Sequence, residues 1–595
     1  MAEKEPAAKL VTPYGGRLVD LVVPAAGRDI LLQKAKCLPS IQISFRSMCD
    51  LELLATGAFS PLDRFMGEKD YRSVLKDMRM TDGTLMPVPV TLPVDCPEGL
   101  KVGSEIVLRS PTNEMLAIMR LDEIFSWNLD EECTEVLGST DSRHPLVSEM
   151  HTWGRHYVSG PVTVMNLPRH NDFQELRIPP AEVRAALEAL GRENVVAYQP
   201  RHPMHRAHEA LTKAAAGDVD GSLLLQPVVG ITGFTDPDHY TRVRCYQTLI
   251  EHYYDPGRTL LNLIPLAVRM AGPRAGLWHG IINRNYGANH FIIGRDPHGP
   301  GMDSHGRAFY ASRDVQELFS AHEAEIGVSM IPHKEMVYLS GGNRYEESGR
   351  VVHGSVEYLR VSATNVIEDS LFHGKRLPEW FTYPEVAQIL FDAHPPKNRQ
   401  GFCIWLTGLP SSGKSTIADV LAPLILSSGR RVTVLDGDVV RTHLTKGLGF
   451  SKADRITNIL RVGFVASEVV RHEGVVICAL ISPYAQARDQ ARAMVGGERF
   501  IEVFVDTPVD VCEVRDVKGM FTMAKRGLIK GFTGVDDAYE PPCSPEVCVN
   551  TVAATPEESA RQILEVLVRQ GFLDFVEKRS KQRTPHTGAV QAAKS

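Results

Sequence analysis

Hydrophobic and polar residues alternate along the chain with two different periods. Residues 181–190 repeat apolar positions every three to four residues, which predicts a helix with one buried face. The short apolar run at 195–199 is typical of a buried strand, and 208–217 return to the helical period. Two more apolar runs, at 223–230 and 291–296, end in polar residues. This alternation predicts a parallel sheet with binding sites at the carboxyl ends of its strands.

Other stretches of the chain follow different patterns. Residues 84–93, TLMPVPVTLP, and 106–108 predict short strands broken by prolines, so the first domain is expected to be β-rich. The stretch HPPKNRQG at 394–401 is typical of a linker, and another α/β block follows it. The basic and polar tail from Glu577 predicts disorder.

Composition narrows the class of protein. The 595 residues, 43% hydrophobic and 23% charged, predict three or four globular domains. The net charge of −7, with no large basic block outside the tail, argues against nucleic-acid binding. Ten scattered cysteines without a CxxC pair predict reduced thiols in a cytoplasmic protein. The chain has no apolar run of 18 residues and starts without a signal-peptide pattern, so neither membrane insertion nor secretion is expected.

The most specific signal in the chain is FCIWLTGLPSSGKST at 402–416. An apolar strand runs into Gly-x4-Gly-Lys-Ser, and a helical period follows, which is the context of a phosphate-binding P-loop. Lys414 would neutralise the β- and γ-phosphates of ATP, and Ser415 would bind the accompanying Mg²⁺. The residues predicted to bind ATP are Gly408, Leu409, Pro410, Ser411, Ser412, Gly413, Lys414, Ser415 and Thr416.

A second predicted strand in this block, RRVTVLDGD, ends at Asp436 and Asp438. Carboxylates at that edge of the sheet would face the P-loop, where they could assist the metal or accept a proton from an attacking hydroxyl. Either aspartate could instead cap the N-terminus of the next helix. The pattern alone leaves both readings open.

Six segments of residues 400–570 resemble, in order, the adenylylsulfate (APS) kinase family. They are GLPSSGKST, LDGDVVR, LGFSKADRITNILR, ISPY, RDVKGM and IKGFTGVDDAYEPP. This family uses MgATP to phosphorylate the 3′-hydroxyl of adenosine 5′-phosphosulfate (APS), giving 3′-phosphoadenosine 5′-phosphosulfate (PAPS). The segment RDVKG, with Lys525 and Lys530 after it, is expected to form a mobile basic lid over the nucleotide.

The resemblance also implies how APS would be bound. Asp438 would lie near the 3′-hydroxyl, and two phenylalanines would sandwich adenine, since aromatic rings stack on purines. Arginines would hold the phosphosulfate because guanidinium groups are planar bidentate donors. The plain alternatives are a surface salt bridge for Arg455 and core packing for Phe450. The implied APS-binding residues are Asp438, Arg441, Phe450, Arg455, Asn458, Ile481, Ser482 and Phe532.

Ser482 matches the position of a phosphoserine intermediate described for the APS kinase family. Two roles are therefore open for its hydroxyl: a covalent carrier of phosphate, or a polar contact in the binding pocket. Direct in-line transfer from ATP to APS, with Ser482 as a pocket contact, is the expectation.

Three histidines lie three residues apart in QPRHPMHRAH, residues 199–208. His202 and His208 would point to opposite sides of a helix, Pro203 breaks its regularity, and no cysteine is near, so no zinc is expected. The pair His205 and His208 instead fits the HxxH pattern of nucleotidylyl-transferring α/β enzymes, in which both rings contact ATP phosphates at a helix N-terminus. A purely structural histidine pair is the alternative.

Five segments between residues 10 and 395 resemble ATP sulfurylase. They are LATGAFSPLDRFMGEKDY, DHYTRVRCY, RMAGPRAGLWHGIINRNYGANHF, GRDPHGPG and PEWFTYPEV. This family joins sulfate to ATP, making APS and pyrophosphate, on a PUA-like domain, a nucleotide-binding α/β domain and a small third subdomain. The implied sulfate- and nucleotide-binding residues are Gln199, Arg201, His205, His208, Gly294, Arg295 and Asp296.

This chain departs from the ATP sulfurylase pattern in its anion-binding loops. Where the family usually has Gln-Thr-Arg-Asn-Pro, residues 199–203 are Gln-Pro-Arg-His-Pro, so Pro200 lacks a hydroxyl and a backbone N–H. Gln226 stands in place of a histidine, residues 297–298 are Pro-His in place of His-Ala, and residues 362–364 are Ser-Ala-Thr in place of Ser-Gly-Thr. Weak or absent sulfurylase activity is therefore expected.

Together these patterns predict a multidomain α/β protein. The expected parts are a β-rich PUA-like domain (1–175), a Rossmann-like nucleotidylyltransferase domain (176–340), a small third subdomain (341–398), a P-loop kinase domain (399–576) and a disordered tail (577–595). The expected partners are ATP with Mg²⁺, APS, sulfate and further copies of the chain, as a dimer through the kinase domain or a hexamer.

Three functions fit these expectations. The chain could be a bifunctional sulfate-activating enzyme, or an APS kinase with a silent sulfurylase-like domain for assembly or regulation. It could also be a nucleotide-sensing protein without turnover, against which the intact kinase motifs argue.

Overall fold

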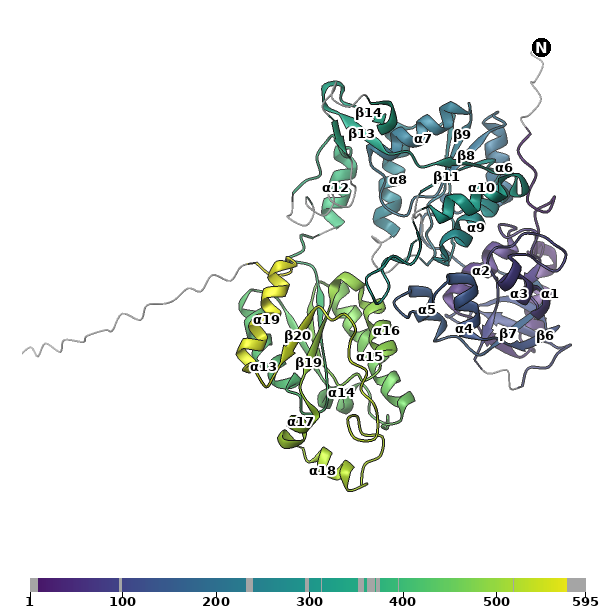
Figure 1. Ribbon diagram of the computed structural model, residues 1–595. Coiled ribbons are helices and arrows are strands. Elements are labelled where there is room, and N and C mark those ends of the chain that lie inside the picture. Colours follow the sequence, from purple (N-terminus) through teal and green to yellow (C-terminus); the bar gives the residue numbers. More distant parts are fainter. Residues whose placement is uncertain are drawn as a thin grey trace, which may run out of the picture.

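Four β-sheets organise the residues that the computed structural model describes, and each sheet belongs to its own stretch of the chain (Figure 1). The described residues are 9–95, 99–231, 239–294, 299–311, 313–351, 358–360, 370, 375–393, 395–516 and 518–574. The tail from Glu577, predicted to be disordered, lies outside these ranges. No helix within them combines the length and the apolar character needed to cross a bilayer.

The N-terminal sheet has seven strands, and all of its pairings except that of β1 with β4 are antiparallel. The strands are β1 (Ser40–Gln42), β2 (Arg64–Phe65), β3 (Pro93–Val94), β4 (Glu105–Arg109), β5 (Met115–Arg120), β6 (Glu123–Ser126) and β7 (His156–Val164). The sheet agrees with the predicted β-rich domain, but helices that the pattern did not predict surround it. They are α1 (Ala25–Ala35), α2 (Phe45–Ala55), α3 (Glu68–Asp77), α4 (Leu129–Glu132) and α5 (Pro145–Met150).

The prediction of strands across residues 84–93 is largely wrong. Of these ten residues, only Leu85, in an isolated bridge with Arg79, and Pro93, the first residue of β3, take part in strand pairing. Three of the ten residues are prolines, which have no N–H to donate to a ladder. The stretch still contributes acceptors: the carbonyls of Val90 and Leu92 accept bonds of 2.9 and 3.0 Å from the N–H groups of Met66 and Val158.

The central sheet is parallel, in the order β10-β9-β8-β11-β12, and confirms the predicted alternation of strands and helices. Its strands are β8 (Val195–Tyr198), β9 (Ser222–Leu225), β10 (Thr259–Leu261), β11 (His290–Ile293) and β12 (Ser329–Pro332). The helices of this region are α6 (Pro180–Ala189), α7 (Arg206–Asp218), α8 (His239–Tyr253), α9 (Gly272–Asn285) and α10 (Asp314–Ile326). The chain order reverses between β8 and β11, so their carboxyl ends flank the crevice where such sheets bind ligands.

A small antiparallel sheet follows, made of β13 (Met336–Leu339), β14 (Arg344–Glu347) and β15 (Tyr358–Arg360). Next along the chain, α12 (Pro384–Ala393) packs against α8 of the preceding region. Leu390, Val386 and Phe381 of this stretch join Tyr246 and Leu249 of α8 in one buried cluster. The small subdomain is thereby attached to the central sheet through side-chain packing.

The C-terminal sheet is also parallel, in the order β17-β18-β16-β19-β20. Its strands are β16 (Phe402–Thr407), β17 (Val432–Asp436), β18 (Val475–Ala479), β19 (Phe500–Asp506) and β20 (Val547–Asn550). Every residue of β16 is buried because helices cover both faces of the sheet. The helices are α13 (Lys414–Ser427), α14 (Gly437–His443), α15 (Lys452–Arg471), α16 (Ala485–Val495), α17 (Val509–Arg515), α18 (Met520–Lys525) and α19 (Pro556–Arg569).

The C-terminal domain contacts the N-terminal domain through α16, which packs against α5 (Figure 1). The hydroxyl of Ser142 donates to Asp489 Oδ2 at 2.6 Å, and Arg143 Nε lies 3.6 Å from Asp489 Oδ1. The next residue along α16, Gln490, donates from its Nε2 to the carbonyl of Ser148 at 3.1 Å. These contacts fix one side of α16 against the rest of the molecule.

A buried ion pair joins the N-terminal and central domains. Arg269, just before α9, donates to both carboxylate oxygens of Asp50 on α2, at 3.1 and 2.7 Å. The two residues are only 7% and 1% exposed. Removing one partner of such a pair leaves the other charge buried without compensation.

We expect Asp50→Ala to destabilise the N-terminal and central domains by about 3–5 kcal/mol, because the Arg269 guanidinium would lose its carboxylate. Urea unfolding followed by tryptophan fluorescence would measure the shift of the midpoint. Asp63→Ala is the matched control, since Asp63 and its partner Arg64 are 59% and 41% exposed at their side chains. The control is expected to cost about 0–1 kcal/mol, and equal shifts in both variants would contradict the role of burial.

Candidate functional sites

A cavity of about 610 Å³ in the C-terminal domain lies at the carboxyl ends of β16, β17 and β18. It brings most of the predicted ATP-binding residues and all of the implied APS-binding residues to one place. The predicted residues in its lining are Pro410, Ser411, Gly413, Lys414, Ser415, Thr416, Asp438, Arg441, Phe450, Arg455, Asn458, Ile481, Ser482 and Phe532. Gly408, Leu409 and Ser412 lie behind this lining, where their oxygen atoms accept bonds from Lys414.

The P-loop holds the Lys414 ammonium in its interior. Lys414 Nζ donates to the carbonyls of Gly408 and Leu409, at 3.0 and 2.6 Å, and lies 3.3 Å from Ser412 Oγ. The side chain is buried, and loss of solvation lowers its pKa to about 8. Gly408 is required by close approach, because a Cβ there would lie 2.6 Å from the carbonyl oxygen of Val505. The loop thus presents one buried cation surrounded by neutral oxygen atoms.

Asp436 caps a helix, which is one of the two roles that the sequence left open, and it also contacts the P-loop. Its Oδ1 accepts the N–H of Asp438 at 2.9 Å and so caps α14, while its Oδ2 accepts the Ser415 hydroxyl at 2.5 Å. A serine hydroxyl beside a carboxylate is a suitable set of oxygen ligands for Mg²⁺, which binds through few protein groups plus phosphates. Asp438 itself lies in α14 with an exposed carboxylate, paired with the Lys518 ammonium.

Arg455 is buried and joins two walls of the cavity. Its Nε donates to the carbonyl of Phe450 at 3.0 Å, and its terminal nitrogens donate to Thr533 Oγ1 and the Gly531 carbonyl. The alternative of a surface salt bridge is therefore wrong, since the residue is 7% exposed. Nearby, the buried Oδ1 of Asn458 has no hydrogen-bond partner among the described residues. An unpaired buried acceptor is costly, so this atom marks a place for a donor on a ligand.

The two phenylalanines of the implied adenine sandwich differ in their surroundings. Phe450 is 44% exposed, and the Arg441 guanidinium carbon lies 4.5 Å from the centre of its ring. Phe532 is 4% exposed and packs edge-on against Phe521 at 5.0 Å. The sequence suggested core packing as the alternative role for Phe450, but Phe450 is exposed. Core packing is seen instead at one edge of Phe532. Both rings line the cavity.

The Ser482 hydroxyl is engaged in the interior of the domain. It donates to Thr407 Oγ1 at 2.8 Å and accepts the indole N–H of Trp405 at 3.1 Å, and the residue is 2% exposed.

Two further basic residues line the cavity and were not named individually from the sequence. Arg515 donates to the hydroxyl of Thr551 at 2.7 Å, and Lys518 pairs with Asp438. Both belong to the segment RDVKG, so this segment was the feature of the sequence that pointed to them.

The HxxH pair lies at the N-terminus of α7, where the sequence placed it. His205 caps the helix, and its ring is 3.9 Å from that of His208 and 4.5 Å from that of Phe381. Burial lowers the pKa of His205 to about 3 and the pKa of His208 well below its ordinary value, so both rings are neutral at pH 7. Neither ring nitrogen of His205 has a hydrogen-bond partner among the described residues.

Gln199, at the carboxyl end of β8, is bonded to two buried side chains. Its Nε2 donates to Gln226 Oε1 at 3.1 Å, and its Oε1 accepts from His279 Nδ1 at 2.6 Å. Burial lowers the pKa of His279 to about 3, so this ring is a neutral donor. Gln226 is 0% exposed. The row Gln226–Gln199–His279 was not predicted, because nothing in the sequence indicated that Gln199 would face His279.

The rest of the implied sulfate site is described only in part. Arg201 Nη1 lies 3.4 Å from the carbonyl oxygen of Gly299, and Gly294 directly follows β11. Arg295 and Asp296 lie outside the described residues, as do the altered positions 297–298 and 362–364. Within the described part of the chain, no three His, Cys, Asp or Glu side chains are grouped so as to hold a metal ion. The absence of zinc from residues 199–208 stays a prediction.

Comparison with known proteins agrees with this arrangement. Family models match in turn as PUA-like domain at residues 11–167, ATP-sulfurylase at 174–393 and adenylylsulphate kinase at 400–550. Sulfate adenylyltransferase of Phaeosphaeria nodorum is 42% identical over 571 residues, which cover 94% of this chain and 99% of the relative. Sulfate adenylyltransferase of Yarrowia lipolytica is 43% identical over 572 residues, with the same coverage of 94% and 99%.

A solved structure extends the likeness to the whole fold. The hexameric APS kinase from Thiobacillus denitrificans matches with a TM-score of 0.63 and 32% identity, over 95% of this chain and 100% of its own. The predicted fold class is confirmed by these matches. Because relatives of more than 40% identity are covered almost completely, the chain belongs to the sulfate adenylyltransferase family of sulfate-activating enzymes and carries a PUA-like, an ATP-sulfurylase and an APS kinase domain.

Proposed function

We propose that the main activity of the chain is transfer of the γ-phosphoryl group of MgATP to the 3′-hydroxyl of APS, in the C-terminal domain. The observation that carries this proposal is the single cavity that P-loop residues and the implied APS-binding residues line together. Phosphoryl transfer needs positioning and charge stabilisation more than covalent chemistry, and a shared cavity provides both.

The residues in the cavity suit the steps of the transfer. Lys414 neutralises charge that develops on the transferred group, and Asp438 accepts the proton of the attacking hydroxyl after leaving its contact with Lys518. Bound Mg²⁺ supplies further charge to the β- and γ-phosphates, and Ser415 with Asp436 would hold it. Arg441 and Arg455 are placed for the phosphosulfate of APS.

Direct transfer from ATP to APS, without a phosphoserine, is part of the proposal. The Ser482 hydroxyl makes one bond as a donor and one as an acceptor inside the domain, to Thr407 and Trp405. Phosphorylation would remove the hydroxyl hydrogen that Ser482 donates to Thr407 and would place a doubly charged group in a buried position. Ser482 is therefore proposed as a structural contact of the pocket wall.

For the N-terminal half, we propose a sulfurylase site of weak or absent activity. Pro200 has no hydroxyl and no N–H, and one of the two N–H groups of the Gln199 amide already donates to Gln226. His205 and His208 are neutral and cannot replace the lost donors with positive charge. Each missing donor to the transition state costs roughly 3 kcal/mol, or on the order of a hundredfold in rate.

The relatives bear on two alternatives for the N-terminal half: an active sulfurylase, or a domain kept for assembly or regulation. The fungal relatives are sulfate adenylyltransferases, which favours an active sulfurylase and a bifunctional chain. The Thiobacillus protein matches over its full length and is described as an APS kinase and a hexamer, which favours a domain kept for assembly or regulation. We propose the second arrangement, with oligomers of the chain as dimers through the kinase domain or as hexamers.

Lys414→Ala is expected to lower APS kinase turnover at least about a hundredfold, because the developing phosphoryl charge would lose its buried cation. A coupled assay with APS and MgATP measures the rate. Lys446→Ala is the control, since Lys446 is exposed and does not line the cavity. Undiminished turnover in Lys414→Ala, with wild-type turnover in the control, would contradict the assignment of the P-loop.

The wild-type chain is expected to form little pyrophosphate from ATP and sulfate, and little ATP from APS and pyrophosphate. Pro200→Thr with His202→Asn is expected to revive part of the activity, and adding Gln226→His should increase it further. If protonated His202 or His298 compensates in the wild type, the residual rate will rise as pH falls through about 6.5. A wild-type rate equal to that of ordinary sulfurylases at neutral pH would show that the site is intact.

Purified, tag-free protein is expected to contain no stoichiometric zinc. The spacing of His202, His205 and His208 does not bring three ligands to one point, and the His205 ring is stacked on Phe381. Elemental analysis by mass spectrometry measures the metal content. One zinc per chain in the wild type, lost in His205→Ala, would overturn this expectation.

A further inference from the structure

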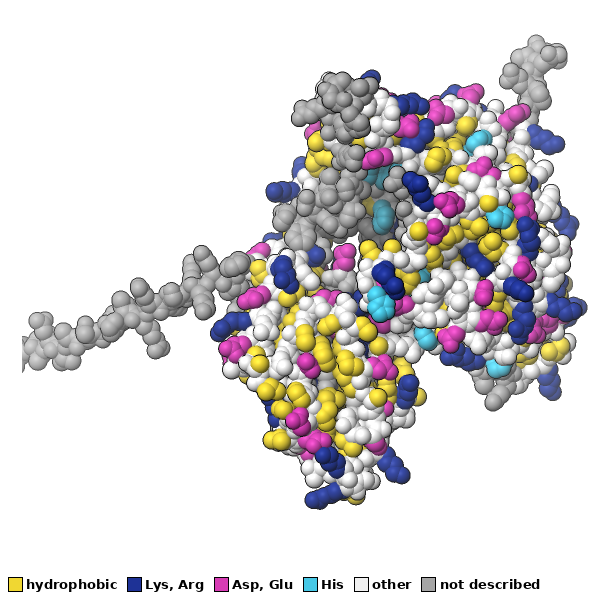
Figure 2. Space-filling view, viewed as in Figure 1, with side chains coloured by type: hydrophobic (Ala, Val, Ile, Leu, Met, Phe, Trp, Pro, Cys, Tyr) yellow, Lys and Arg dark blue, Asp and Glu magenta, His cyan; other side chains and the backbone are white. Residues whose placement is uncertain are grey.

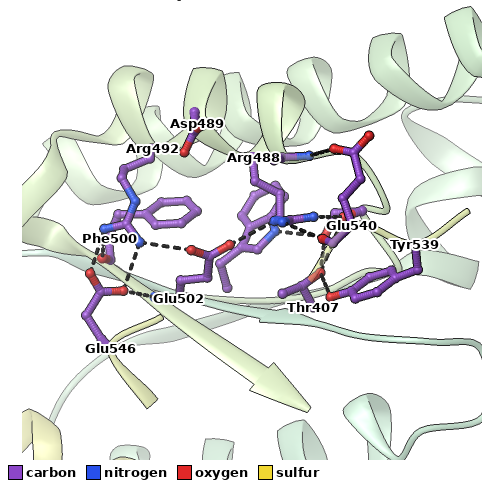
Figure 3. A network of polar contacts seen from close by, with 12 residues as sticks. Thr407, Arg488, Asp489, Arg492, Phe500, Glu502, Tyr539, Glu540 and Glu546 are labelled. Carbon is purple, nitrogen blue, oxygen red and sulfur yellow. Dashed lines mark hydrogen bonds and ion pairs between the residues drawn. The ribbon is translucent and has the colours of Figure 1, made fainter. Parts of the chain in front are cut away.

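Arg488 extends from the first turn of α16 into the kinase domain and lies between two backbone segments (Figure 3). Its Nη1 donates to the carbonyl of Ser482 at 2.7 Å, and its Nη2 donates to the carbonyl of Glu540 at 2.8 Å. Arg488 is 2% exposed and does not line the cavity, so it cannot contact a substrate directly. These two carbonyls connect Arg488 to the walls of the cavity.

The first segment has a backbone conformation that needs support. Ser482 has a φ of 41°, in the left-handed region that costs a residue with a side chain about 1–2 kcal/mol. Its hydroxyl is held by Thr407 and Trp405, and its carbonyl by Arg488. Ile481, the preceding residue, also lines the cavity and has its carbonyl bonded to Thr407 Oγ1 at 2.9 Å. The wall of the cavity at 481–482 is thus fixed from both sides.

The second segment is the end of the stretch that begins with Phe532 and Thr533 in the opposite wall of the cavity. The Glu540 N–H donates to the carbonyl of Pro483 at 2.8 Å, and the Glu540 carboxylate accepts the N–H of Ala485 at 2.7 Å. The two segments therefore run side by side, and the Arg488 guanidinium is bonded to both. A shift of this guanidinium would change the spacing between the two walls.

A buried row of alternating charges holds the guanidinium in place (Figure 3). Arg488 Nε donates to Glu502 Oε1 at 2.9 Å, and the other oxygen of Glu502 accepts from Arg492 at 3.2 Å. Arg492 in turn donates to both carboxylate oxygens of Glu546, at 2.7 and 2.9 Å. Two cations and two anions compensate each other, which is the condition under which buried charge is tolerated. Glu502 lies on β19, next to the strand that leads into the P-loop.

We propose that Arg488 is a positioning residue for APS: its guanidinium sets the distance between the cavity wall at Ser482 and the segment that ends at Glu540. The proposal rests on the proposed kinase function, because it assigns this side of the cavity to APS. The P-loop, which would bind ATP, has no bond to Arg488 among the contacts described for these residues.

The test is Arg488→Lys, which keeps the charge beside Glu502. A single ammonium cannot reach Glu502 and both carbonyls in the fixed directions of a guanidinium. The KM for APS is expected to rise about tenfold, as for the loss of a hydrogen bond from a charged donor, while the KM for ATP changes less than about twofold. Steady-state kinetics with each substrate varied in turn separates the two values.

Arg492→Lys is the matched control. Arg492 lies one turn along the same helix, is equally buried and is bonded to the same Glu502, but its other partners, Glu546 and the Phe500 carbonyl, do not line the cavity. Both variants are expected to lower the melting temperature, and only Arg488→Lys is expected to raise the KM for APS. Equal changes of the KM in both variants, or none in Arg488→Lys, would overturn the proposal.

Glu540→Ala keeps the test decisive if Arg488→Lys fails to fold. Glu540 is exposed, and the substitution removes only its carboxylate bond to Ala485, so the melting temperature should stay within about 2 °C of the wild type. The KM for APS is expected to rise about two- to threefold, and an unchanged KM would contradict the proposal. A wild-type chain without APS kinase turnover would instead refute the proposed function, which separates the two failures.

Discussion

Arg269, Arg488 and Arg492 are each buried against a carboxylate, because a charge taken out of water costs several kcal/mol unless a partner compensates it. These pairs connect parts that are far apart in the sequence: Arg269 joins two domains, and the other two hold α16 to the C-terminal sheet. Lys414 is the informative contrast. Its ammonium is equally buried, yet the atoms that accept its bonds are neutral carbonyl and hydroxyl oxygens, and its pKa is lowered. A phosphate would supply the missing counter-charge.

The C-terminal cavity and the carboxyl edge of the central sheet differ in how their polar and charged groups are paired. In the C-terminal cavity, polar atoms remain available to a ligand, such as the Oδ1 of Asn458, and the exposed carboxylate of Asp438 on α14 is paired with the Lys518 ammonium. At the carboxyl edge of the central sheet, Gln199 is bonded to Gln226 and His279, which engage its carbonyl oxygen and one of its two amide N–H groups. Gln226 Nε2 and both ring nitrogens of His205 have no hydrogen-bond partner among the described residues, and these groups are neutral. The C-terminal cavity thus offers charged side chains to a ligand, whereas the side chains bonded to Gln199 are neutral.

Helix α16 contacts the N-terminal domain with one face and the C-terminal sheet with another. On the face drawn in Figure 2, the C-terminal domain and the larger N-terminal part meet along one side of the C-terminal domain. At that contact Asp489 and Gln490 bind the N-terminal domain, while Arg488 and Arg492, their neighbours in sequence, turn to the sheet. The docking of the domains and the wall of the kinase cavity therefore share one rigid helix.

The sequence by itself determined what depends on short-range order. The P-loop, the strand and helix alternation of both parallel sheets, and the place of His205 at a helix N-terminus follow from spacing within about twenty residues, and these predictions are confirmed. The prediction of strands at 84–93 was largely wrong, because prolines lack the N–H donors that hydrogen bonding between strands requires. Only the tertiary structure decided that Gln199 meets His279, that Phe450 is exposed, and that Arg488 bonds to Ser482 and Glu540. Such contacts join residues that no local pattern relates, because packing of helices on sheets, and not sequence spacing, brings them together.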